Sequence, residues 1–124
     1  MIKIRFVSKA LCLVVFSLFV QMGLYAQNEK PFVVPELKEW KGSEGVFTPS
    51  ADMRVVYAQD ALRSVAEAFA ADYGQMFGVT PEVIQGKPSA GDIYFTLKKD
   101  KKLGREGYAI RTDRYVTVSA PEAV

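Results

Sequence analysis

The stretch from Met53 to Gln85 constrains the fold most tightly, because two extended segments flank a long helical pattern. Residues 53–57 alternate and are rich in β-branched side chains, which predicts a strand. A stripe of apolar side chains at spacings of three and four then predicts a helix: Leu62, Val65, Ala66, Phe69, Tyr73, Met76 and Phe77. Residues 82–85 restart an extended chain. The three elements therefore form a βαβ unit, whose strands run parallel.

The helix has recognisable ends. Asp60 precedes the stripe and is a credible N-cap, since its carboxylate can accept from free amides of the first turn. Gly78 follows the stripe where a left-handed C-terminal cap belongs. A helix of about 17 residues spans about 26 Å, enough to cross a small sheet. Gly74 inside it costs up to about 1 kcal/mol relative to alanine, and the sequence does not show what packs there.

Further strands lie on both sides of this unit. Pro35 marks an edge segment, and we expect a small hairpin that pairs Leu37–Trp40 with Gly45–Thr48. Residues 85–91 read as a loop. Three more strands are predicted at Asp92–Leu97, Gly107–Arg111 and Tyr115–Ala120, the last two joined by a tight turn at residues 112–114.

Alternation divides the predicted sheet into two faces. One face is apolar and meets the helix, with Ile93, Phe95, Leu97, Tyr108, Ile110, Val116, Val118 and Ala120. The other is mixed, with Tyr94, Thr96, Ala109, Tyr115 and Thr117, and a second layer would cover it. Residues 121–124 resemble the first residues of a helix. The predicted fold class is α+β: a mixed, mainly antiparallel sheet with a βαβ unit, one long helix on one face, and a truncated second helix. The chain then reads as the leading piece of a longer protein.

Residues 1–26 have the three-part plan of a secretory signal. Lys3, Arg5 and Lys9 precede the apolar run Ala10–Val20, which is shorter than the roughly 20 residues of a membrane span, and small residues end at Ala26. We predict cleavage near Ala26–Gln27 rather than retention as an anchor, a flexible lead-in at 27–31, and a domain at 32–124. Contact with a membrane is expected only through the signal.

Export to a bacterial periplasm or outer surface follows from the signal and from cysteine usage. Cys12 is the only cysteine and lies inside the apolar run, so the mature chain has no thiol for a disulfide, a nucleophile or a zinc site. Of 16 Lys and Arg residues, 13 remain after residue 26, against 14 acidic residues. The mature chain is therefore near neutral, which argues against a nucleic-acid surface.

Catalytic motifs are sparse. The chain has no histidine, which removes the commonest general base and every histidine-dependent triad. Gly86-Lys87-Pro88 echoes a phosphate loop, but the spacing is wrong and a proline replaces the magnesium-binding hydroxyl. The carboxylates considered for a two-acid site read as solvated, because none lies in an apolar cluster that would raise its pKa: Glu36, Glu39, Glu44, Asp52 and Asp92. We predict no catalytic, cofactor-binding or metal-binding residues.

Two surface features admit a binding role. The basic run Lys98–Lys102 with Arg105 could hold phosphate or an acidic polymer, but no aromatic is interleaved, so a solvated turn is favoured. Trp40 is the only tryptophan. It could stack on a sugar, although packing beneath the first hairpin is favoured.

Three places together resemble one known family. They are Val33–Leu37 with Trp40 and Gly45–Phe47, the strand 53–57 leading into the helix, and Glu106–Ile110 followed by Val116–Ala123. These resemble the N-terminal α+β domain that precedes the catalytic barrel of glycoside hydrolase family 20, the β-N-acetylhexosaminidases. Leu37 departs from the commoner Pro-x-Pro at this place. Related leading domains occur in other exo-glycosidases, including α-glucuronidases.

The resemblance implies a non-catalytic domain of an exported enzyme that removes terminal N-acetylhexosamine. The catalytic Asp-Glu pair would lie in a C-terminal barrel of the same polypeptide, which is the expected partner, and no cofactor is implied. Two alternatives remain open: a stand-alone exported carbohydrate-binding module that reads glycan through Trp40, and the leading domain of another exo-glycosidase such as an α-glucuronidase.

Overall fold

The structure is a computed structural model that describes residues 27–123. The chain divides into two compact units, Met1–Gly45 and Val46–Val124, and each is treated by itself. The predicted signal at 1–26 lies outside the described residues. Within 27–123, no helix combines the length and apolar character that a membrane crossing requires.

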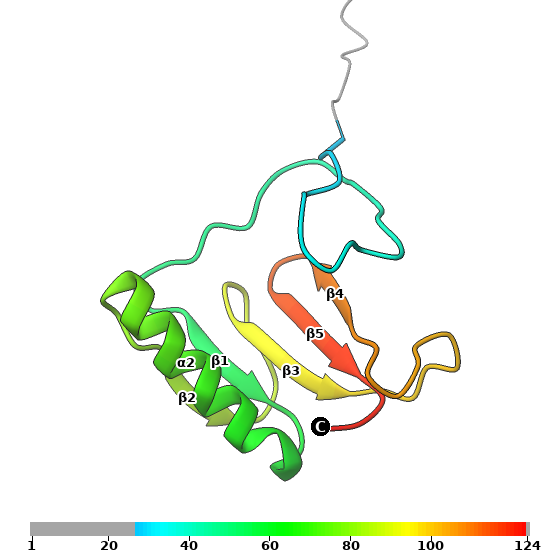
Figure 1. The fold of residues 1–124 in the computed structure, drawn as a ribbon. Coiled ribbons are helices and arrows are strands. Elements are labelled where there is room, and N and C mark those ends of the chain that lie inside the picture. Colours follow the sequence, from blue (N-terminus) through cyan, green and yellow to red (C-terminus); the bar gives the residue numbers. More distant parts are fainter. Residues whose placement is uncertain (1–26, 124) are drawn as a thin grey trace, which may run out of the picture. The chain divides into compact units, whose positions relative to one another are not determined.

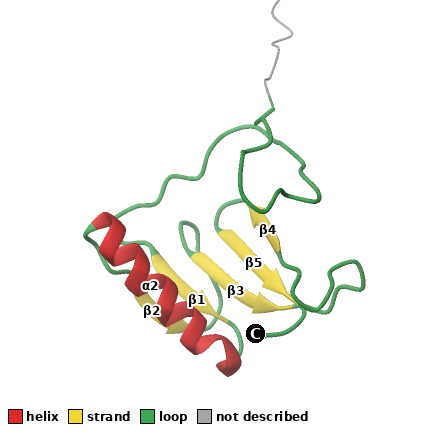
Figure 2. Ribbon diagram, in the orientation of Figure 1, coloured by secondary structure: helices red, strands yellow, loops and turns green. Residues whose placement is uncertain are grey.

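In the described residues of the second unit, 46–123, a five-stranded sheet carries one α-helix on one face, which confirms the predicted α+β class (Figures 1 and 2). Its elements follow in the order β1 (Arg54–Tyr57), η1 (Asp60–Leu62), α2 (Arg63–Phe77), β2 (Glu82–Gln85), β3 (Ile93–Leu97), β4 (Ala109–Thr112) and β5 (Val116–Ala120).

The βαβ unit predicted from residues 53–85 is confirmed. β1 and β2 pair in parallel, with Val55 opposite Val83, and α2 connects them. Gly78 ends α2 at φ 77°, the left-handed cap that glycine adopts without a steric penalty. The prediction that Asp60 caps the N-terminus of the helix is wrong. Asp60 makes no capping bond, because the chain enters the helix through the 3₁₀ turn η1.

The strand order is β2-β1-β3-β5-β4. β1 pairs with β2 and β3 in parallel, and β3 pairs with β5 in parallel. Only β4 runs antiparallel, as the edge strand beside β5. The expected mixed sheet is present, but the expectation of mainly antiparallel pairing is wrong. The 109–120 hairpin docks through its second strand, which places β5 parallel to β3.

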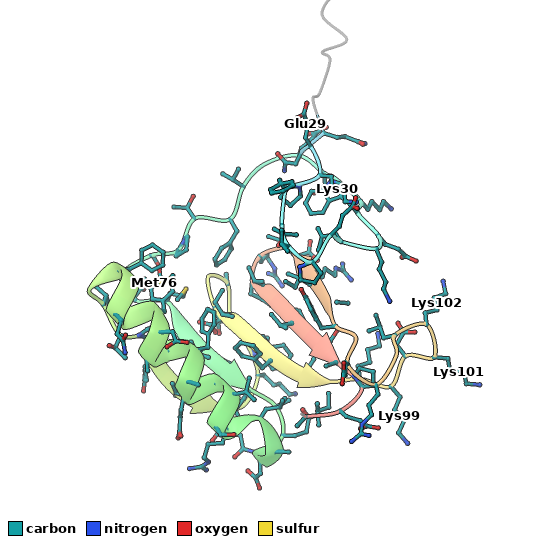
Figure 3. All side chains as sticks on the ribbon, in the orientation of Figure 1. Glu29, Lys30, Met76, Lys99, Lys101 and Lys102 are labelled. Atoms are coloured by element: carbon teal, nitrogen blue, oxygen red, sulfur yellow. The ribbon has the colours of Figure 1, made fainter. Side chains whose placement is uncertain are left out.

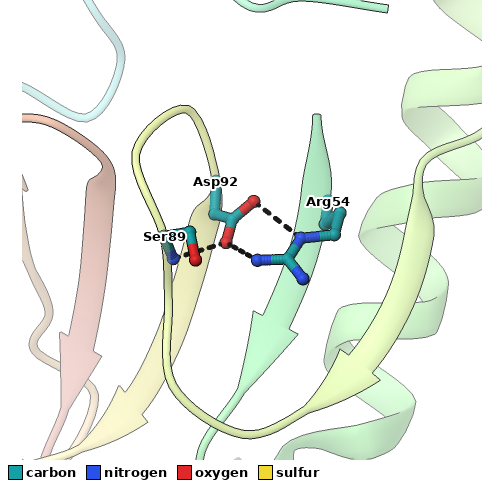
Figure 4. Close-up of polar contacts among 3 residues, drawn as sticks. All are labelled: Arg54, Ser89 and Asp92. Carbon is teal, nitrogen blue, oxygen red and sulfur yellow. Dashed lines mark hydrogen bonds and ion pairs between the residues drawn. The ribbon is translucent and has the colours of Figure 1, made fainter. Parts of the chain in front are cut away.

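The connection from β2 to β3 crosses β1 on the face opposite α2 (Figures 1 and 4). Both strands are parallel to β1 and flank it, so this short loop must pass over it. Val55 and Tyr57 belong to the core on the helix side, whereas Val56 points to the other face by alternation and is also fully buried. Val56 is thus buried on the face of the sheet that this loop crosses, opposite α2.

The core lies between α2 and the inner strands. Its buried members are Met53, Val55, Tyr57, Leu62, Ala66, Ala70, Ile93 and Phe95. Most of the predicted stripe packs there, but Phe77 at the end of α2 is 61% exposed. Met76 beside it is 71% exposed (Figure 3). Gly74 lies where a Cβ would overlap Thr80 Oγ1, so the glycine allows the chain after the helix to pack closely.

The helix covers less of the sheet than predicted, because α2 lies along β1 and β2 instead of crossing every strand (Figure 1). Val116 and Val118 of β5 touch the core but stay half-buried. Tyr108 and Ile110, expected against the helix, are 56% and 60% exposed. The apolar face therefore remains open over β4 and β5.

The opening segment forms no hairpin: the described residues 27–48 contain no strand, so the predicted pairing of 37–40 with 45–48 is wrong. Within the first unit the chain instead closes around Asn28. The Asn28 amide donates to Ser43 O at 2.9 Å, and its side chain donates to Gly45 O at 2.7 Å. Residues 121–123, which resemble the start of a truncated helix, form no helical turn by themselves.

Candidate functional site

The most buried charge in the second unit is Asp92, just before β3 (Figure 4). Arg54, the first residue of β1, donates two hydrogen bonds to Asp92: from Nη2 to Oδ2 at 2.6 Å and from Nε to Oδ1 at 3.1 Å. The Ser89 amide donates to Oδ2 at 2.7 Å. The parallel register that sets Val55 opposite Ile93 brings the two preceding residues together. This two-pronged geometry is the one in which guanidinium and carboxylate bind most strongly.

Burial alone would raise the pKa of Asp92, but the hydrogen bonds from Arg54 and Ser89 and the guanidinium charge outweigh it and lower that pKa. The same pairing raises the pKa of Arg54. Asp92 is thus held ionised, with its oxygens occupied by donors. Asp92 therefore joins the starts of β1 and β3. It is not suited to acid catalysis, because an acid catalyst needs a raised pKa. The prediction that Asp92 is a solvated surface carboxylate is wrong.

The other carboxylates considered from the sequence are exposed, as predicted. Glu36 pairs with Lys30 at 2.6 Å within the first unit, and its side chain is 83% exposed. Asp52 accepts from the Ser50 hydroxyl at 2.6 Å, and this bond lowers the pKa of Asp52. Glu39 and Glu44 lie on the surface of the first unit. In the part of the chain that the structure describes, no three His, Cys, Asp or Glu side chains gather as metal ligands would.

The basic run forms the solvated turn that was favoured. Lys99, Lys101 and Lys102 extend outward from the loop between β3 and β4 (Figure 3). Asp100 Oδ1 accepts from the Lys102 amide at 2.9 Å and so shapes the turn from within. Arg105 meets Glu122 at 3.4 Å with both side chains exposed, a pairing of little energetic weight.

Neither Trp40 nor the Gly86-Lys87-Pro88 sequence has the structural role that its sequence motif suggested. Trp40 is 45% exposed, and its indole N–H donates to Asn28 O at 3.2 Å, so packing beneath a hairpin is wrong. Gly86 donates its amide to Tyr57 O at 3.0 Å and begins the loop that crosses β1. These residues therefore connect strands and do not form a phosphate loop.

The β4–β5 turn holds an open concavity of about 310 Å³. Its lining is polar: Arg111, Asp113, Arg114, Tyr115 and Thr117. None of these residues was proposed as a site from the sequence. The sequence showed only a tight polar turn at this place. The concavity could not be predicted from it, because its depth depends on how β4, β5 and the loop before β3 pack together.

Comparison with protein-family models gives one family over most of the chain. Residues 30–123 match the model described as "Glycosyl hydrolase family 20, domain 2". Comparison with curated protein sequences found no match. The matched range spans the described part of the second unit and most of the described part of the first.

Proposed function

The chain belongs to the family of domain 2 of family 20 glycosyl hydrolases, and on this basis we propose that it is a non-catalytic domain of an exported β-N-acetylhexosaminidase. The family match over residues 30–123 is the observation that carries the proposal. In this proposal, a catalytic barrel on the same polypeptide removes terminal N-acetylhexosamine. The domain positions and stabilises that barrel.

The chemistry of the described side chains supports a non-catalytic role. A glycosidase of the usual kind needs a carboxylic acid with a raised pKa beside a second carboxylate. Here Asp92 is fixed by Arg54 with a lowered pKa, and the pKa of Asp52 is lowered as well. Glu36, Glu39 and Glu44 are exposed on the first unit.

The open part of the sheet supports attachment to a further domain. Ile110 and Tyr108 present apolar side chains at the β4 edge, beside the half-buried Val116 and Val118 of β5. Apolar surface of this kind, next to an edge strand with unpaired backbone groups, is unfavourable in water and suits a domain interface. We assign it to contact with the rest of the enzyme.

Export remains part of the proposal. Its support is the basic start, the apolar run and the small-residue exit of residues 1–26. Mass spectrometry of the chain recovered from a bacterial periplasm or culture medium should show a terminus near Gln27. An intact Met1 on the exported protein would contradict cleavage.

The reading frame beyond the Val124 codon tests the proposal directly. We expect it to continue into a barrel that carries adjacent aspartate and glutamate. A stop codon after Val124 in the natural gene would refute the attached-domain proposal and favour a stand-alone carbohydrate-binding module. A continued frame that encodes a different catalytic domain would identify another exo-glycosidase.

A further inference from the structure

The concavity at the β4–β5 turn lies on the face of the sheet opposite α2. Val116 and Val118 pack against the helix-side core, so by alternation Tyr115 and Thr117 point to the other face. The strand register places Arg111 and Tyr94 on either side of Thr117. A cation, a hydroxyl and an aromatic ring therefore share one row across three strands.

The backbone beneath the concavity is well fixed. Across the turn, the Asp113 amide donates to Tyr115 O at 3.1 Å. The Gly91 amide donates to Arg114 O at 2.8 Å, and the Val116 amide donates to Asp92 O at 3.0 Å. Because Asp92 is itself held by Arg54, the turn is tied to the starts of β3 and β1. A preformed hollow binds a ligand without a large ordering cost.

The concavity carries a surplus of positive charge. Arg111 Nη2 meets Asp113 Oδ2 at 2.7 Å, which orients the guanidinium. A guanidinium has five N–H donors, so most of them remain free for a ligand. Arg114 is exposed and makes no ion pair with any residue of 27–123. Two guanidinium groups against one carboxylate favour an anion, and their planar donors match a carboxylate.

The remaining lining suits a sugar ring. The Tyr115 ring stands at 88° to the Tyr94 ring, with centroids 6.3 Å apart, which braces it in place. Tyrosine offers an apolar ring surface with a polar tip, and Thr117 adds a hydroxyl that both donates and accepts. A volume of about 310 Å³ is at the lower end for small-molecule sites and suits one sugar residue.

We propose that this concavity binds a monosaccharide unit bearing a carboxylate, the chemical class of the hexuronic acids. Arg111 and Arg114 receive the carboxylate, Thr117 and the Tyr115 hydroxyl bond ring hydroxyls, and the Tyr115 ring contacts the C–H surface. The site is open at its rim, where Arg111 is 81% exposed, so binding is weak. A ligand of about 13 non-hydrogen atoms at ordinary efficiency gives a dissociation constant on the order of 1 mM. This site stands independently of the proposed enzymatic role.

The test is an NMR titration of the full chain with glucuronate, using glucose as the neutral analogue and inorganic phosphate as the free anion. Glucuronate should shift the resonances of residues 111–117, while glucose and phosphate each bind about tenfold more weakly or not at all. Arg111→Ala should weaken glucuronate binding about tenfold, the usual effect of losing a charge-assisted contact. Arg111→Lys keeps the charge but loses the planar guanidinium that can donate two hydrogen bonds to one carboxylate. Its affinity for glucuronate should therefore lie between those of the wild type and Arg111→Ala. Lys101→Ala removes a cation from a distant loop and should leave binding unchanged.

Equal affinity for glucose and glucuronate would overturn the claim that the two arginines recognise the carboxylate. Phosphate binding as tight as glucuronate would overturn the saccharide assignment. An Arg111→Ala chain that binds like wild type, or no shift at 20-fold the expected dissociation constant of about 1 mM, would overturn the site. Since Arg111 is exposed, the variants should fold, and unchanged shifts in α2 would confirm this.

Discussion

The pairing of Arg54 with Asp92 allows a quantitative prediction for Asp92→Asn. This variant keeps the shape of the side chain but removes the charge that accepts three hydrogen bonds, at 2.6, 2.7 and 3.1 Å. Breaking a fully buried ion pair costs about 3–5 kcal/mol. Here the Arg54 side chain is 31% exposed and can regain water, while Asp92 is 4% exposed. We therefore expect a loss of about 2–3 kcal/mol in the free energy of unfolding, near the strength of one or two charge-assisted bonds.

The measurement is unfolding by urea and by heat, followed by circular dichroism at pH 7. For a domain of this size the loss corresponds to a fall of about 10–20 °C in Tm. The matched control is Asp72→Asn, which removes a carboxylate from the exposed side of α2. It should leave the midpoint near that of wild type.

The pH dependence provides a second readout on the same pair. Because the pKa of Asp92 is lowered in the folded state, the pair stabilises the fold above the ordinary aspartate pKa of about 3.9. That stability is lost as the pH falls from there through the lowered native value. Wild type should lose this contribution on acidification, and Asp92→Asn should lack it. Equal midpoints at pH 7, or parallel pH profiles for the two proteins, would refute the reasoning.

Three further substitutions test the packing. Gly74→Ala should destabilise by about 1–3 kcal/mol, because its Cβ would overlap Thr80 Oγ1 and cancel the usual helix gain; a gain in urea midpoint would contradict the close approach. Val56→Ala should cost about 1.5–3 kcal/mol, as expected for a fully buried valine, whereas Val46→Ala at an 87% exposed position should change little; equal melting curves would disprove a covered second face. Ile110→Asp should reduce concentration-dependent self-association in sedimentation without lowering Tm, since Ile110 is exposed at the β4 edge. A wild-type chain that stays monomeric at every concentration would count against that open edge.

The sequence predicted the elements whose signals are local. The stripe on α2, the alternation of β3 and the left-handed cap at Gly78 depend on side chains a few residues apart, and all three are present. The 3₁₀ turn at Asp60–Leu62 was missed, because a polar residue before a helix looks the same whether or not it caps.

Non-local pairing escaped prediction. Each strand was found, but neither the parallel neighbours of β3 nor the edge position of β4 is encoded in one strand's alternation. The burial of Asp92 was not predicted for the same reason, because it depends on which strands are neighbours. Once β1 and β3 are known to be parallel with Val55 opposite Ile93, the arginine and aspartate before them fall together. The concavity at Arg111 and Thr117 depends on the same register and was equally hidden.

Hydrolysis of an aryl N-acetyl-β-D-glucosaminide tests the central claim most directly, comparing the purified 124-residue chain with the polypeptide encoded by the full reading frame. A non-catalytic domain that supports an attached barrel predicts turnover by the longer polypeptide and none by this chain. Turnover by the 124-residue chain at a comparable kcat would contradict the assignment.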